Sequence, residues 1–347
     1  MTNPVSRRDF LKYSMATGAL VASGDGALQA ARAEPAKGSP EVDKLTVWTV
    51  TDNYYDTNRP DARYAKRYRA GPGRSFHAEH GVSFYVEAVV GGRTNACMFD
   101  YGSDPVGVAN NLALLGIDVG KVDAFALSHG HWDHYTSAAA ILARNKARIA
   151  AGTPFYVGEE AFARRYSLRP GASEPTDLGQ LRREDIEDAG LKVVEVKAPV
   201  QIVPGGQLTG PIERVTPYEK GQPSMQVRRG DKLEQDAFPG EQGLFFHVRG
   251  KGLVVISGCA HAGIVNTVRQ AMKVAGTTKL LAVMGGCHLI NAKPEVIEST
   301  VGDLKSMKPE CIVPAHCSGF EAILALNREM PNEFVLNTAG TQFTFAA

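Results

Sequence analysis

The chain has 347 residues, of which 44% are hydrophobic and 22% charged, and this composition is ordinary for a soluble globular protein. The formal net charge is +1, and the first 33 residues carry more positive than negative charge, so the rest of the chain is close to neutral. Such a body lacks the basic face that binds phosphate backbones, and we expect no nucleic-acid partner.

The N-terminus predicts an export signal. Residues 6–12, Ser-Arg-Arg-Asp-Phe-Leu-Lys, resemble the twin-arginine motif, and a modestly apolar stretch follows at about 13–23. That stretch is too short and too rich in small residues for a stable membrane span. Ala31-Arg32-Ala33 fits a small-x-small cleavage site. We therefore expect residues 1–33 to be a twin-arginine signal peptide, the twin-arginine export machinery to be a partner, and the mature protein to be periplasmic or secreted.

Residues 34–44 are expected to be a linker, and residues 45–347 to form the folded domain. Strands are expected where apolar and β-branched residues gather between turn formers, at 45–51, 82–90, 95–100, 122–127, 192–196, 200–203, 244–249, 252–257 and 311–314. Helices are expected from their apolar spacing at 106–116, 136–148, 262–274 and 295–307. Residues 158–240 are rich in Gly, Pro and charge, and we interpret them as an insertion that covers the active site. The order, a β-hairpin first and then strands mixed with helices, favours an α/β fold of two sheets between helices.

Residues 128–134 read Ser-His-Gly-His-Trp-Asp-His and follow an apolar strand directly. His129 and His131 alternate, so both can face one metal ion. Asp133 and His134 lie beyond the turn and can face a second ion. Imidazole suits zinc, iron, copper and nickel, and a carboxylate broadens the range. This pattern predicts a centre for two divalent metal ions, with zinc as the expected metal.

The same run resembles the HxHxDH signature of the metallo-β-lactamase fold superfamily. Residues 99–102, Phe-Asp-Tyr-Gly, resemble its strand-end Asp, and residues 312–319 resemble the late motif with its last histidine ligand. The resemblance implies an αββα sandwich of two mixed β-sheets flanked by helices. It also implies that His316 binds metal and that Asp100 stands behind the ligands and orients a histidine.

A narrower likeness runs from about residue 45 to 345. The segments that carry it are 79–83, 257–266, 285–289 and 314–319, and they resemble the 7,8-dihydropterin-6-methyl-4-(β-D-ribofuranosyl)aminobenzene-5'-phosphate synthase-like subgroup. Asn53, in Thr-Asp-Asn, matches an N-terminal element of that subgroup and is expected behind the metal ligands. The likeness implies a pterin-related compound as one candidate for the small-molecule substrate.

The sequence departs from the superfamily pattern in the later motifs. Gly258-Cys259 stands where Gly-Asp is expected, and no histidine precedes the strand at 244–249. His261 is the best candidate for the remaining ligand, and Cys259 is expected behind the ligands. His288 stays open between a ligand, an acid, a substrate contact and a histidine that is merely satisfied in a Gly-rich loop. The histidines expected to be structural or peripheral are His77, His80 and His247.

The five cysteines contain no CxxC pair, and their odd number argues against a complete disulfide framework. Cys97 and Cys311 fit small buried apolar residues. Twin-arginine systems are associated with proteins exported already folded, so this chain need not depend on disulfides even where the compartment permits them.

Two neighbouring cations lower the pKa of a bound water, so we expect an exported dinuclear hydrolase that uses a metal-bound hydroxide on an ester, lactone or phosphoester. The candidate catalytic residues are Asp133, His261 and His288. Asp133 would be a poor base once bound to metal, whereas either histidine could protonate the leaving group. Two alternatives stay open: a metal-dependent oxidoreductase on the same fold, and a non-catalytic protein that binds a metal or a pterin.

Overall fold

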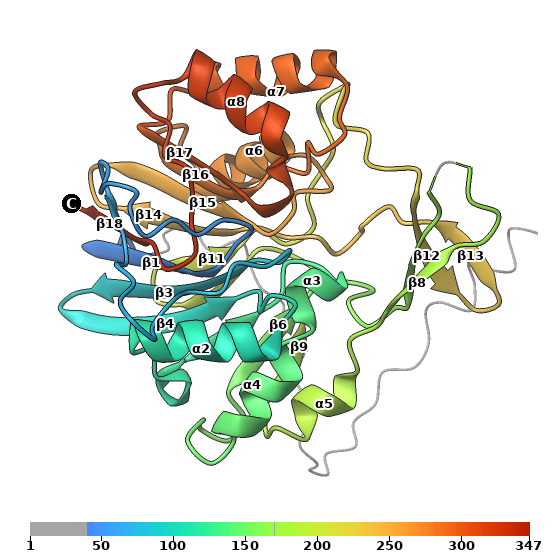
Figure 1. Ribbon diagram of the computed structural model, residues 1–347, viewed down its shortest axis with the longest axis horizontal. Coiled ribbons are helices and arrows are strands. Elements are labelled where there is room, and N and C mark those ends of the chain that lie inside the picture. The colour runs from blue at the N-terminus through green and yellow to red at the C-terminus, as the bar shows by residue number, and fades with distance from the viewer. Residues whose placement is uncertain (1–39, 170) are drawn as a thin grey trace, which may run out of the picture. The chain divides into compact units, whose positions relative to one another are not determined.

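The structure is a computed structural model, and it describes residues 40–169 and 171–347 (Figure 1). The expected signal peptide at 1–33 and most of the expected linker lie outside the described residues. Within the described part, two mixed β-sheets pack face to face, and helices cover the outer face of each. The αββα sandwich implied by the metal-binding motif is therefore confirmed.

The first sheet has eight strands in the order β2 (Ala65–Lys66), β18 (Gln342–Ala346), β1 (Lys44–Thr51), β3 (Ser83–Val90), β4 (Arg93–Phe99), β5 (Ala124–Ala126), β6 (Pro154–Val157) and β9 (Lys192–Glu195). Its outer face is covered by α2 (Pro105–Leu115), α4 (Ala138–Asn145) and α5 (Arg183–Glu187).

The second sheet has six strands in the order β10 (Val200–Val203), β11 (Gly206–Leu208), β14 (Leu244–Val248), β15 (Gly252–Ser257), β16 (Leu280–Gly286) and β17 (Cys311–Ala315). Its outer face is covered by α6 (Ile264–Ala275), α7 (Pro294–Ser306) and α8 (Phe320–Glu329).

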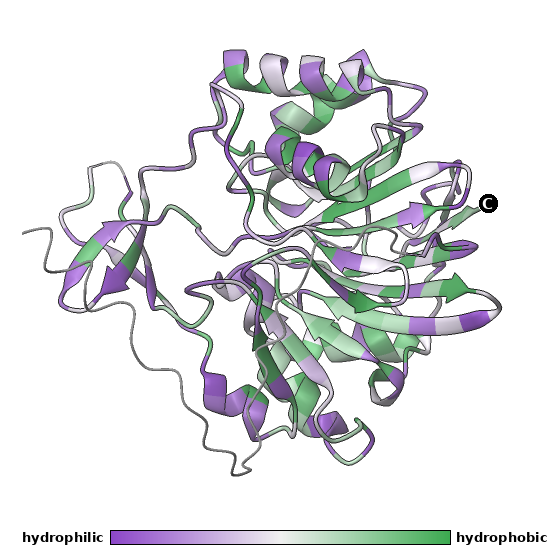
Figure 2. Ribbon diagram, turned by 180° about the vertical axis from the view of Figure 1, so that it is seen from behind, coloured by the Kyte–Doolittle hydropathy of each residue, from purple (hydrophilic) through white to green (hydrophobic). Residues whose placement is uncertain are grey.

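Three apolar cores follow from this layering. The central core joins the inner faces of the two sheets, and side chains such as Phe84 and Phe246 are fully buried there. A second core lies between the first sheet and its helices, and a third lies between the second sheet and its helices. Figure 2 shows the same division, with apolar runs along the strands and hydrophilic residues on the outer helix faces. Burial of apolar surface on both faces of each sheet is the main force that holds such a sandwich together.

Local sequence explains several element boundaries. Gly91 and Gly92 have φ angles of 56° and 79°, which a two-residue hairpin between β3 and β4 requires. The Asp104 side chain accepts a hydrogen bond from the Val106 backbone N–H and caps α2, and Pro105 occupies its first turn. The expected helix at 136–148 differs, because the chain forms the short helix α3 (Trp132–Tyr135) before α4.

Residues 158–240 contribute to three different sheets. Strands β9, β10 and β11 and helix α5 belong to the sandwich. The remaining strands form a small antiparallel sheet in the order β13 (Lys232–Gln235), β12 (Met225–Arg229), β7 (Arg165–Ser167) and β8 (Thr176–Gly179). Figure 2 shows this small sheet as mostly hydrophilic. Among the described residues, no helix has the length and apolar character needed to cross a bilayer.

Candidate metal centre

The site lies where several strands end at one edge of the sandwich. Strands β15, β16 and β17 run parallel, as do β4 and β5, so their carboxyl ends meet at the same edges of the two sheets. Loops that follow parallel strands in this way form the usual binding crevice of α/β folds. The loops after β5, β15, β16 and β17 carry His129, His261, His288 and His316 respectively.

The loop after β5 brings its four ligand-type side chains together. His129, His131, Asp133 and His134 are all buried, with at most 7% of any of them exposed. The ring centroids of His129 and His131 lie 4.7 Å apart, and those of His129 and His134 lie 4.3 Å apart. Gly130 is required between them, because a Cβ atom there would lie 2.3 Å from the Ala161 carbonyl oxygen.

The first donor group joins this loop to the segment after β15. The Nε2 atoms of His129 and His261 lie 3.1 Å apart, and the rings of His131 and His261 are 4.7 Å apart. Burial, followed by the neighbouring histidines, lowers the pKa of His129 well below its ordinary value. These imidazoles are therefore neutral, which is the form that binds metal.

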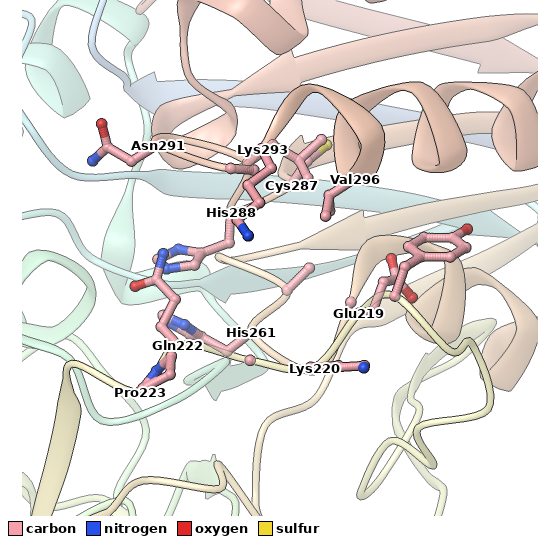
Figure 3. Close-up of a pocket in the computed structure, with 16 residues that line it drawn as sticks. Glu219, Lys220, Gln222, Pro223, His261, Cys287, His288, Asn291, Lys293 and Val296 are labelled. Carbon is pink, nitrogen blue, oxygen red and sulfur yellow. The ribbon is translucent and has the colours of Figure 1, made fainter.

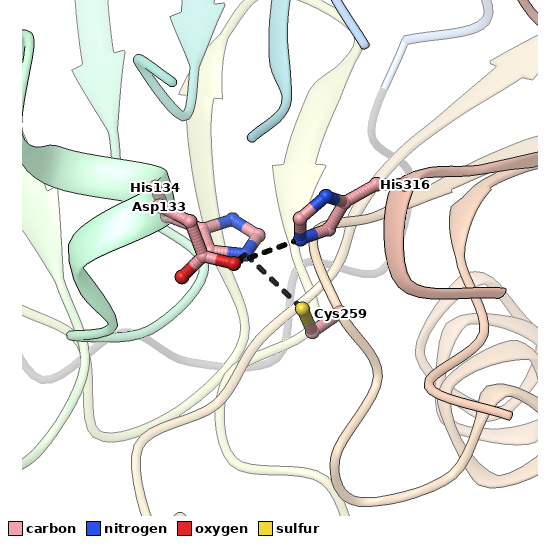
Figure 4. A group of neighbouring side chains, drawn as sticks. All are labelled: Asp133, His134, Cys259 and His316. Atoms are coloured by element: carbon pink, nitrogen blue, oxygen red, sulfur yellow. Dashed lines mark hydrogen bonds and ion pairs between the residues drawn. The ribbon is translucent and has the colours of Figure 1, made fainter. Parts of the chain in front are cut away.

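The second donor group contains Asp133, His134, Cys259 and His316 (Figure 4). Asp133 Oδ2 lies 3.0 Å from His316 Nε2, and Cys259 Sγ lies 3.1 Å from His134 Nε2. Burial opposes ionisation of Asp133, but His134 and His316 outweigh it and lower the pKa of the carboxyl far below its usual value. The group thus holds a carboxylate, two imidazoles and a thiol around one point.

Cys259 belongs to both groups. Its Sγ lies within 4.8 Å of the donor atoms of His129 and His261 and also of those of Asp133, His134 and His316. From the sequence Cys259 is expected behind the ligands, whereas in the structure its sulfur lies among the donor atoms. It stands where the superfamily pattern has an aspartate.

Asp100 orients two histidines from behind. Its Oδ2 lies 2.7 Å from His134 Nδ1 and accepts a 2.7 Å hydrogen bond from the Ser128 hydroxyl. Because that hydroxyl donates to Asp100, it accepts from His129 Nδ1, which lies 2.9 Å away. Both rings therefore carry their proton on Nδ1 and turn an Nε2 lone pair toward the site. Gly258 leaves room for this contact, since a Cβ there would lie 2.1 Å from Ser128 Oγ.

His316 is held in the same way by the residues after β1. Asn53 Oδ1 lies 3.3 Å from His316 Nδ1, and Asn53 Nδ2 donates to the His316 carbonyl at 3.1 Å. Asp52 accepts a 2.8 Å hydrogen bond from the His316 backbone N–H, and burial raises the pKa of this carboxyl to about 6. Asn53 is expected from the sequence as a supporting residue, but Asp52 is not, and only its place in the same motif could have indicated it.

Glu241 is a second supporting residue, which the sequence marks only as an acidic residue ahead of the strand at 244–249. Its buried carboxylate accepts hydrogen bonds from the backbone N–H groups of His261, at 2.7 Å, and of Ala262. Burial raises the pKa of Glu241 to about 7. No local motif marks it, because the contact joins positions 20 and 21 residues apart across a turn.

Two further histidines border the centre. The ring of His288 lies 3.9 Å from that of His261, centroid to centroid. His80, which the sequence analysis treated as peripheral, has its Nε2 atom 3.6 Å from Asp133 Oδ2 and its ring 4.8 Å from that of His316. His80 is half exposed, so it stands between solvent and the second donor group.

A cavity of about 350 Å³ opens beside His261 and His288 (Figure 3). Its wall also contains Tyr218, Lys220, Cys287 and Lys293. The volume is that of a small-molecule site. Glu219 also lines it, but its carboxylate already accepts hydrogen bonds from Thr216 and from the backbone N–H groups of Val265 and Asn266, so the two lysines favour an anionic ligand. Phe238 closes the opposite side of His261 by stacking on its ring at 3.9 Å.

The donor set fits metal ions. The Nε2 atoms of His129 and His261 lie 3.1 Å apart, and His316 Nε2 lies 3.0 Å from the Asp133 carboxylate, so each close pair must share a proton or a cation. Burial lowers the pKa of His316, but Cys317, Asp133 and Asp52 outweigh it and raise the pKa to about 9. Positive charge is thus favoured at this nitrogen, and a cation between the donors would satisfy the buried lone pairs.

The comparisons with known proteins agree with this geometry. The model of the Metallo-beta-lactamase superfamily matches residues 80–261, and that of the TAT (twin-arginine translocation) pathway signal sequence matches residues 4–24. The first match takes in the HxHxDH loop and His261 and ends before His316. The second falls in the segment expected to be a signal peptide.

Three relatives cover most of the chain. One comes from Methanocaldococcus jannaschii and is named 7,8-dihydropterin-6-methyl-4-(beta-D-ribofuranosyl)-aminobenzene-5'-phosphate synthase. It is 29% identical over 308 residues, which span 88% of this chain and 98% of the relative. A second from the same organism, uncharacterized protein MJ0448, is 25% identical over 269 residues, which span 77% and 94%. The crystal structure of Tm1679, a metal-dependent hydrolase of the beta-lactamase superfamily, has a TM-score of 0.66 at 24% identity and covers 87% of this chain and 100% of its own.

Proposed function

The chain belongs to the metallo-beta-lactamase superfamily, and on that premise we propose that it is an exported hydrolase that uses two divalent zinc ions to cleave an ester, a lactone or a phosphoester. The observation that carries this proposal is the set of buried Nε2 atoms that face other electron-pair donors. The Nδ1 atoms of three of these histidines already have partners, which are Ser128 for His129, Asp100 for His134 and Asn53 for His316. Only a proton or a metal cation can stabilise such an arrangement away from water.

Each ion has its own set of ligands in this proposal. One ion would be held by His129, His131 and His261, and the other by Asp133, His134 and His316. Cys259, which stands in place of the expected aspartate, would complete the second set with a thiolate. Ions bound there would lower the pKa of water and polarise the oxygen of the group under attack.

The protein's own groups position the reactants and move protons. Asp100 and Asn53 fix the orientation of His134 and His316, and Glu241 fixes the segment that carries His261. His288 lines the cavity beside His261, where its imidazole can protonate the leaving group. Burial of the donor atoms excludes bulk water from all but the cavity side.

The cavity restricts the substrate to a small molecule. Its lysines, Lys220 and Lys293, would attract a phosphate or a carboxylate. The name of the archaeal relative contains both a pterin and a phosphate, so a pterin-related phosphate compound is the first substrate to assay. The match to a twin-arginine signal supports export, with the mature protein in the periplasm or outside the cell.

A second candidate function is a synthase that acts on a pterin-related phosphate. The observation that favours it is the similarity to the named synthase, which spans 98% of that relative. The same donor groups and cavity would serve it, since polarisation of a bound oxygen is common to both reactions.

One experiment separates the candidates. The protein is purified without added metal, and its metal content is measured by elemental analysis. It is then assayed on ester, lactone and phosphodiester reporters and on a dihydropterin. We expect about two zinc ions per chain and hydrolysis of at least one reporter class. His131→Ala should lose metal and activity together. Reporter silence with full metal content, together with turnover of the pterin, would decide for the synthase.

A further inference from the structure

A third group of donor atoms lies beside the two described above. Cys259, His288 and Cys317 bring Sγ, a ring nitrogen and Sγ within 4.8 Å of one another. They come from the loops after β15, β16 and β17, three neighbouring parallel strands, so the sheet itself brings them together. The superfamily motifs account for neither Cys317 nor His288.

His288 is held in a conformation that its surroundings do not explain. Its φ angle is 47°, in the left-handed region that residues with a side chain seldom adopt. Neither ring nitrogen has a hydrogen-bond partner of ordinary geometry within residues 40–169 and 171–347, although both atoms are buried. His288 is partly buried and lines the cavity, so its two unpaired ring nitrogens are available to a ligand bound there.

The thiols of Cys259 and Cys317 lie close together in a buried part of the site. Cys317 is 3% exposed, and its Sγ lies 3.5 Å from the Cys259 carbonyl oxygen. Gly286 keeps the space between them open, because a Cβ atom there would lie 2.7 Å from Cys317 Sγ and 3.1 Å from Cys259 Cα. A larger residue at this position would separate the thiols.

We propose that Cys259, Cys317 and His288 bind a further divalent cation of the thiophilic class, zinc in the resting protein. Two thiolates and an imidazole are a ligand set that zinc accepts with its fourth position left open. His288 and Cys287 line the cavity, so the open position faces the substrate. Each cysteine releases its proton to solvent as the ion binds, and no oxidation is involved.

The inference rests on the proposed metal centre in one respect, which is that Cys259 is a ligand shared with the Asp133 group. As a ligand of the further ion, His288 would position that ion and would not be the acid that protonates the leaving group. A thiolate has the lone pairs to bridge two ions. The role of the third ion would be to bind a Lewis-basic group of the substrate at the cavity wall, next to the ions that carry out hydrolysis.

Cobalt is the probe that tests this site. The full chain is purified under reducing conditions, freed of metal with a chelator and titrated with Co²⁺. Two quantities are recorded, which are the number of cobalt ions per chain and the sulfur-to-cobalt charge-transfer absorption. We expect Cys317→Ser and His288→Ala to bind one ion fewer than the wild type. Cys317→Ser should also lose part of the charge-transfer intensity, because one of the thiolate ligands is gone. Cys311→Ser, which removes another buried thiol, should match the wild type.

The outcomes separate this inference from the proposed function. His131→Ala should lose a different ion and keep the charge-transfer band. Wild-type cobalt content and band in both Cys317→Ser and His288→Ala would overturn the third site and leave the two-ion centre intact. Should a variant fail to fold, X-ray absorption on the wild-type zinc protein decides, since the third site requires more zinc–sulfur scattering at about 2.3 Å than Cys259 alone supplies. A Cys259–Cys317 disulfide in the purified protein would also overturn the proposal.

Discussion

The Nε2 atom of His129 lies 3.1 Å from that of His261, although 132 positions separate the two residues in the sequence. The contact joins the loop after β5 of the first sheet to the loop after β15 of the second sheet. The centre therefore sits across the two sheets, and neither sheet could hold it alone. Its donors are fixed by the packing of the sandwich as much as by the HxHxDH motif.

The first prediction concerns His261. His261→Ala removes one of three imidazoles from the first donor group, so we expect the loss of about one metal ion per chain and at least a hundredfold loss of hydrolysis. Elemental analysis and a reporter assay measure both effects. His247→Ala is the matched control, because the His247 side chain pairs with Glu41 and lies outside the donor groups. Unchanged metal content in His261→Ala would remove His261 from the ligands.

The second prediction concerns Asp100. Asp100→Asn keeps the shape of the side chain but weakens its hold on His134 Nδ1 and Ser128, so the two histidines are less firmly oriented. We expect zinc affinity to fall by about 10- to 100-fold while the fold is retained. Competition with a chromophoric chelator gives the affinity. Asp118→Asn, which alters a surface carboxylate paired with Arg148, should leave it unchanged.

Much of this architecture could be predicted because its signals are local. The Gly91-Gly92 hairpin, the Asp104 cap of α2 and the HxHxDH loop each lie within a few adjacent residues. Backbone geometry then determines the hairpin and the helix start, and ligand chemistry identifies the loop as a metal-binding segment.

The rest could not be predicted because it depends on contacts between distant segments. From the sequence Cys259 is expected only behind the ligands, and the approach of the loops after β5 and β15 places its sulfur among imidazoles. Glu241 and Asp52 act through backbone N–H groups of His261 and His316, which no sequence pattern records. His80 resembles a loop histidine until the fold brings it to Asp133.

The third prediction is a pH dependence at Glu241. Its pKa is raised by burial to about 7 from 4.5, so the folded protein holds a proton that the unfolded chain releases. The free energy of unfolding of the metal-free protein should therefore fall as pH rises through this window, by about 3 kcal/mol from this group. Glu241→Gln cannot ionise and should lose that part of the slope in urea titrations at several pH values. Glu329→Gln, an exposed control, should keep it. Parallel slopes in wild type and Glu241→Gln would contradict the prediction.

The last prediction concerns the sulfur of Cys259. Cys259→Asp restores the carboxylate of the superfamily pattern and exchanges a soft donor for a hard one. We expect the variant to retain the ions held by the histidines but to shift its preference from zinc toward manganese, because oxygen ligands favour harder cations. Elemental analysis after growth in equal zinc and manganese measures the shift. Cys259→Ala, which offers no donor, should instead lose metal whichever ion is supplied. Equal zinc content in wild type, Cys259→Asp and Cys259→Ala would mean that the sulfur only packs beside the ligands, and the thiol would then have to be explained by the apolar contacts of the segment after β15.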